Sequence, residues 1–222
     1  PVNFDADGEV VYDIAYGNNL VSYSYQTDQS LGDALGDATA NVYAIAGEGV
    51  AALNTDPQLS GPNGWAGSLV DFEGGNGYWL VATAEFSFSF NGVADGISRI
   101  NIEQKPPQIP EEFKFIQSTK QAFYFVENVT ISDGHIDDDD IIIAYNGDVV
   151  VGSRYWNGNF TDIPAMGIDD IYSHNGYCRI GDEVSFKIYD FSNDQLIDMW
   201  IEGNSTWSEL GISIINLSEI CD

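Results

Sequence analysis

Residues 121–156, QAFYFVENVTISDGHIDDDDIIIAYNGDVVVGSRYW, carry the pattern that decides the fold. Segments rich in β-branched and aromatic residues are separated by an acidic turn and by the pair Asn146-Gly147. An Asn-Gly pair between two apolar runs is the strongest short-range signal for a β-hairpin. The stretch therefore predicts two strands joined at Asn146-Gly147 and a mainly β fold.

Outward from this stretch, most of the chain has the same strand character. Residues 30–40, SLGDALGDATA, predict a short helix, with Ser30 as N-cap and Asp33 at its third position. Phe86, Phe88 and Phe90 alternate with serines, so they are predicted to face one side of a sheet and join the core.

A proline-containing segment divides the chain. Residues 104–112, QKPPQIPEE, are polar and contain three prolines, which favours an extended, stiff linker. We predict an N-terminal small α+β repeat domain over residues 1–103 and a C-terminal antiparallel β-sandwich over residues 113–222.

The net charge excludes several partners. The formal charge is −28, with 35 acidic residues against 7 Lys and Arg. Nucleic acids and anionic membrane surfaces are disfavoured because both require a basic face. No apolar run is long enough to span a bilayer, and the start at Pro1 favours a mature or excised segment. A saline habitat, bound calcium and simple solubility each account for the acidity.

The densest acidic cluster is a candidate metal site. Asp137, Asp138, Asp139 and Asp140 follow Asp133 within a few residues. Carboxylates of this kind bind Ca²⁺, the one cofactor that the sequence suggests. The alternative is a solvated turn that keeps a strand end from pairing further.

Arg154, Tyr155 and Trp156 form the candidate ligand site, because a scarce arginine beside aromatics can clamp a sugar or an acidic group. The alternative is a structural ion pair between Arg154 and Asp148 or Asp182. All five tryptophans also offer surfaces for sugar stacking, although most are expected in the core. They are Trp65, Trp79, Trp156, Trp200 and Trp207.

Two kinds of covalent modification are suggested. Cys178 and Cys221 form a disulfide in an oxidising compartment, or else remain buried thiols. Four Asn-x-Ser/Thr triplets are candidate glycosylation sites. Their asparagines are Asn128, Asn159, Asn204 and Asn216.

No catalytic motif is present in the sequence. It contains no G-x-S-x-G element, and its histidines, His135 and His174, fall in polar stretches. Nothing in the spacing of the many acids selects the facing pair that a glycosidase needs. We therefore expect a protein that is not an enzyme, with a glycan-active enzyme as the least favoured alternative.

The motifs GNNLVSYSY, GEGVAA, GWAGSLVDFEGGNGYW and FSFSF, within residues 10–92, resemble a repeat of surface and secreted proteins of marine bacteria. The motifs QAFYF, DDDDIIIAYNGDVVVGSRYW, DIPAMG and FKIYD, within residues 113–200, resemble a β-sandwich module found beside that repeat. Where members of the second family often have Cys, this chain has Val149 or Val150, so the resemblance implies that a family disulfide is missing.

Neither family has an assigned activity, so the resemblance implies an extracellular or cell-surface location and an architecture. We expect a structural or adhesive module, such as a subunit of a surface assembly or filament. Its β edges are expected to pair with other copies or with other surface proteins. The alternative is a carbohydrate-binding module of a secreted glycan-active protein, with glycans as partners.

Overall fold

The computed structural model of the protein describes residues 2–4, 10–56, 64–92, 109–132, 134–169 and 175–220. The chain divides into two compact units. The first comprises Pro1–Gly47 and Ala51–Gln108, and the second comprises Glu48–Val50 and Ile109–Asp222. The division after Gln108 falls inside the predicted linker, of which residues 104–108 lie outside the described residues.

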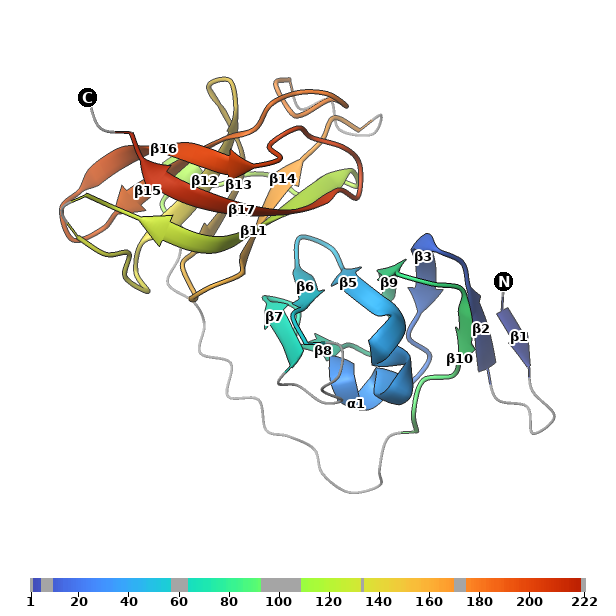
Figure 1. Ribbon diagram of the computed structural model, residues 1–222. Helices are drawn as coiled ribbons and strands as arrows, with labels where there is room; N and C mark the ends of the chain where they lie inside the picture. Colours follow the sequence, from blue (N-terminus) through green and yellow to red (C-terminus); the bar gives the residue numbers. More distant parts are fainter. Residues whose placement is uncertain are drawn as a thin grey trace. The chain divides into compact units, whose positions relative to one another are not determined.

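In its described residues, the first unit contains three small sheets and a short helical segment (Figure 1). The 3-stranded sheet has the order β1(Val2–Phe4), β2(Val10–Ile14), β10(Phe86–Phe88). The 5-stranded sheet has the order β3(Gly17–Ser22), β9(Gly77–Ala82), β5(Val42–Ala46), β6(Ala51–Asn54), β7(Trp65–Gly67). A 2-stranded sheet pairs β4(Gln29–Ser30) with β8(Asp71–Phe72).

The predicted helix is present but shorter. Ser30 caps α1(Leu31–Leu35), and its hydroxyl oxygen accepts a hydrogen bond from the Asp33 amide at 3.2 Å. The chain continues as the 3-10 helix η1(Gly36–Asn41). Gly36 has a φ of 52°, which interrupts the regular α-helix.

Aromatic rings form much of the core of the first unit. Phe88 and Phe90 both pack on Tyr12 with ring centroids 5.6 Å apart, as the alternating phenylalanines predict. Phe72 lies 5.1 Å from Phe90 and stacks on Tyr23 at 5.4 Å. Such offset and edge-to-face pairs add to the stability gained from burial.

The described part of the second unit forms one sheet of seven strands (Figure 1). Its strand order is β13-β12-β15-β16-β17-β11-β14. The strands are β11(Gln121–Thr130), β12(Ile141–Asn146), β13(Val149–Tyr155), β14(Thr161–Met166), β15(Ser185–Asp190), β16(Gln195–Gly203) and β17(Ile212–Glu219). The prediction of a mainly β fold is confirmed, and so is the hairpin at Asn146-Gly147, where Gly147 has a φ of 60°.

The sheet differs from the prediction in two respects. First, β11 pairs with β17 in parallel, so the sheet is mixed and not antiparallel throughout. Second, the sheet is almost closed, because its two end strands, β13 and β14, approach each other. A Cβ atom at Gly152 on β13 would lie 1.6 Å from the carbonyl oxygen of Pro164 on β14. Only glycine permits this approach.

The curved sheet has a core on each side. The main core lies inside and contains Tyr124, Phe186 and Trp207, whose indole Nε1 donates to the Ala165 carbonyl at 2.9 Å. A smaller core lies outside, where Phe113 of η3(Glu111–Phe113) covers Ile141 and Ile143. Alternate residues of β12 therefore face the two cores, which explains its continuous apolar run IIIA.

Candidate functional site

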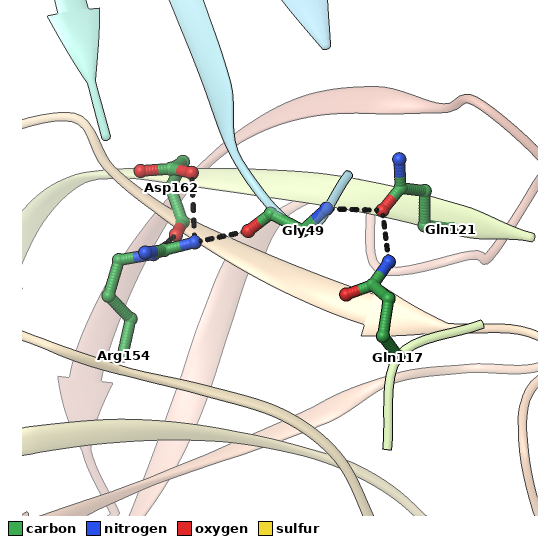
Figure 2. Close-up of polar contacts among 5 residues, drawn as sticks. All are labelled: Gly49, Gln117, Gln121, Arg154 and Asp162. Atoms are coloured by element: carbon green, nitrogen blue, oxygen red, sulfur yellow. Dashed lines mark hydrogen bonds and ion pairs between the residues drawn. The ribbon is translucent and has the colours of Figure 1, made fainter. Parts of the chain in front are cut away.

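The arginine predicted for ligand binding lies at the meeting of β13 and β14. The guanidinium of Arg154 donates from Nε to the Asp162 carbonyl at 2.5 Å and from Nη2 to the Gly49 carbonyl at 2.6 Å. Nη2 also lies 3.3 Å from the Asp162 carboxylate, whose side chain is 1% exposed (Figure 2). The prediction that Arg154 pairs with Asp148 or Asp182 is wrong, because its ion pair is with Asp162 of β14.

Gly49 belongs to the same polar cluster of the second unit. Its amide donates to Oε1 of Gln121 at 3.0 Å, and that oxygen also accepts Nε2 of Gln117 at 3.0 Å (Figure 2). Gly49 has a φ of +69°, and a Cβ there would lie 2.6 Å from the Gln117 side chain. Both backbone groups of Gly49 are thus held, and sequence reasoning missed this residue because it lies 105 residues from Arg154 and 72 from Gln121 in the chain.

The three residues of the predicted ligand site do not share one surface. Tyr155 packs beside Phe113 against the outer core, whereas Trp156 packs against the main core. Neighbouring residues of a strand point to opposite faces, so the Tyr155 and Trp156 rings do not line one pocket. Their role in ligand binding stays a prediction.

The acidic turn uses one carboxylate to hold its own backbone. Asp140 is buried, and its carboxylate accepts the amides of Asp137 at 2.9 Å and Phe191 at 3.0 Å. Burial raises the pKa of Asp140, and the two amides counteract part of that rise. Asp137 lies 3.2 Å from Nε2 of His135. This turn links the start of β12 to the β15–β16 connection.

Calcium binding at this turn stays a prediction. Within the described ranges, no three His, Cys, Asp or Glu side chains converge as a metal site. Asp133, the fifth predicted ligand, lies outside the described residues. A lower melting temperature in EDTA would confirm bound calcium, and an unchanged one would contradict it.

Cys178 is buried in the main core. Burial raises its pKa to about 12, with the nearby Asp182 contributing in the same direction. Cys221 lies outside the described residues, as does His174. The disulfide between Cys178 and Cys221 therefore stays a prediction.

Three of the four candidate glycosylation asparagines are joined by hydrogen bonds. Nδ2 of Asn159 donates to Oδ1 of Asn128 at 3.2 Å, and Nδ2 of Asn128 donates to Oδ1 of Asn216 at 3.1 Å. The fourth, Asn204, is exposed at the end of β16, beside Thr206, whose hydroxyl donates to Glu183 at 2.8 Å. Glycosylation at all four sites stays a prediction.

The outward face of β16 was not singled out from the sequence. In QLIDMWIEG, Ile197 and Met199 face the main core, whereas Asp198, Trp200 and Glu202 are exposed. Trp200 is 67% exposed. The sequence pattern could have predicted its exposure, because Trp200 occupies one of the alternate positions of the strand that otherwise hold polar residues.

No protein-family model matches the chain, and the curated proteins and solved structures likewise give no match. The resemblance to secreted bacterial repeats therefore stays a prediction. In the part of the chain that the structure describes, no helix has the length and apolar character needed to cross a membrane.

Proposed function

We propose that this chain is a non-catalytic extracellular module with a structural or adhesive role, which associates with further copies of itself through a sheet edge. The observation that carries the proposal is the edge strand β3. It pairs only with β9 among the described strands, and it lies within residues 14–27, which contain no charged residue.

This edge exposes two large apolar side chains beside uncharged polar ones. Leu20 of β3 is 64% exposed, and Tyr16, just before the strand, is 77% exposed. Proteins usually protect such edges with lysine, proline or a bulge, and β3 has none of these. Tyr12 donates to the Ser22 carbonyl at 2.6 Å and Asn19 donates to the Gly17 carbonyl at 2.9 Å, so the middle of the strand is the part available for pairing.

A second copy of the chain is the partner that this edge fits. Two molecules with a formal charge of −28 repel each other, and the repulsion is weakest where neither presents a charge. Two copies of β3 can pair antiparallel across a two-fold axis, with the Leu20 side chains buried at the contact.

The state of the polar clusters supports a non-catalytic role. Arg154 and Asp162 bond to each other, and Arg154 also bonds to the Gly49 backbone. Asp140 bonds to two backbone amides. These bonds connect strands and turns within the fold.

Sedimentation velocity over a range of concentrations tests this proposal. We expect concentration-dependent self-association of the native chain and its loss in Leu20→Lys, which places a charge on the edge. Val70→Lys is the matched control, because Val70 is 65% exposed but lies outside the strands. A native protein that stays monomeric, or equal behaviour of the two variants, would refute the proposal.

A further inference from the structure

The outward face of β16, β17 and β11 carries an exposed tryptophan among polar side chains. Trp65, Trp79 and Trp156 are partly buried and Trp207 is 2% exposed, so Trp200 alone of the five leaves most of its surface in water. An indole ring on the outside of the sheet can offer a face for stacking, and its exposure leaves apolar surface uncovered.

The neighbours of Trp200 are fixed by the register of the strands. Asp198 and Glu202 flank it on the same face of β16. Ser218 of β17 lies directly opposite Trp200, and Asn216 lies directly opposite Glu202. Side chains in directly opposite positions are about 5 Å apart at Cβ, which is within reach of a single ligand ring.

An ordered row of amides continues this face onto β11. Asn128 pairs with Asn216 in the parallel register of β11 and β17, and the hydrogen bond between their side chains fixes both amides. Asn159 extends the row by donating to Asn128. The face therefore presents an aromatic ring, a carboxylate, a hydroxyl and oriented amides in sequence.

We propose that this face, centred on Trp200, binds a neutral pyranose of a glycan. A pyranose has an apolar face of C–H groups that stacks on an aromatic ring and a rim of hydroxyls that bond to carboxylates and amides. Glu202 accepts hydrogen bonds from hydroxyls, and Asn216 and Ser218 both donate and accept them.

The charges on the face select against other ligands. Anionic glycans are repelled by the Glu202 carboxylate and by the formal net charge of −28. Asp198 is already paired with Lys187 at 2.7 Å, so the face presents more neutral hydrogen-bonding groups than unpaired carboxylates. A basic peptide is for this reason the less favoured occupant, although a cation can also stack on an indole.

The face is rigid enough to act without rearrangement. Met199 and Ile201, on either side of Trp200, pack against the main core, and β16 is hydrogen-bonded on both sides, to β15 and β17. A ligand that docks here does not have to order a loop, which favours binding by a preformed surface. This function goes beyond self-association, which we assign to β3 of the other unit.

Isothermal titration with neutral gluco-, manno- and galacto-oligosaccharides tests the proposal. The protein is first checked by mass spectrometry for unmodified Asn128, Asn159 and Asn216. We expect binding of at least one neutral oligosaccharide, weakened about 30-fold or more in Trp200→Ala, as for the loss of a central aromatic contact. Phe191→Ala is the matched control, because Phe191 is an exposed aromatic, at 55%, in the turn after β15, and its affinity should be unchanged.

Two further arms make the outcome decisive. Glu202→Gln retains a hydrogen-bonding side chain, so it should change affinity for a neutral sugar by less than about threefold, whereas a lysine-rich peptide would lose most of its binding. Leu20→Lys should bind the sugar as the native chain does. The proposal is overturned if no neutral oligosaccharide binds at millimolar concentration, if Trp200→Ala equals Phe191→Ala, or if only the lysine-rich peptide binds.

Discussion

Replacing Arg154 by methionine should destabilise the second unit strongly. Methionine fills a similar volume but removes the charge and both hydrogen-bonded nitrogens of the guanidinium. The Asp162 carboxylate, 1% exposed, would then lose the cation 3.3 Å from it, and the Gly49 carbonyl would lose the donor on Nη2. Removing one partner of a buried pair costs about 3–5 kcal/mol, and because Arg154 is 23% exposed we expect about 3 kcal/mol.

Lys187→Met is the matched control. Lys187 and Asp198 also form an ion pair on this sheet, but their side chains are 33% and 63% exposed. Exposed pairs contribute no more than about 1 kcal/mol, so this variant should unfold almost as the native chain does.

Urea unfolding, combined with hydrogen exchange of the β13 and β14 amides, measures both effects and assigns them to the second unit. The double variant Arg154→Met with Asp162→Asn should recover part of the loss, since the buried charge that lost its ion pair with Arg154 is gone. A loss for Arg154→Met no larger than that for Lys187→Met would show that the cluster contributes little to stability.

Three other experiments, two on substituted chains and one on the native chain, have definite expected outcomes. Gly152→Ala should cost about 3 kcal/mol because its Cβ would meet the Pro164 carbonyl at 1.6 Å, whereas Gly134→Ala, with open space around it, should be neutral in the same urea assay. The pKa of Asp140 is raised in the folded protein, so its contribution to the free energy of unfolding is complete below the ordinary pKa of 3.8 and is lost as pH rises through the raised pKa. In Asp140→Asn, the urea midpoint should therefore change less with pH over this range. Cys178, whose pKa is raised to about 12 by burial, should resist a thiol reagent at neutral pH until urea unfolds the protein, and rapid labelling of this residue in the native protein would contradict that burial.

Local patterns in the sequence predicted the local parts of the fold. The pair Asn146-Gly147 needs a turn with positive φ, and the alternation on either side fits a hairpin, which the structure has. Ser30 has the hydroxyl that caps the first turn of a helix. The length of that helix was overestimated, because Gly36 ends the regular α-helix early.

These local patterns did not predict which strands lie beside each other in the sheet. Periodicity shows which side of β11 is apolar, but it does not show that its neighbour is β17 and parallel. Arg154 was predicted to pair with Asp148 or Asp182 although Asp162 is only 8 residues away in the chain, because spacing does not show that β14 closes the sheet against β13. The exposure of Trp200 could have been predicted, because it stands between two acids in the polar phase of β16.

The parallel pairing of β11 and β17 has a consequence for how the protein is made. These strands are the first and last of the second unit, and Phe123 pairs with Ile212 across about 90 residues of chain. A ribosome must therefore release nearly all of this unit before the sheet can close. Until then β11 has an unpaired side that a chaperone or a neighbouring nascent chain can occupy, so we expect production yield to depend on how quickly the final strand arrives.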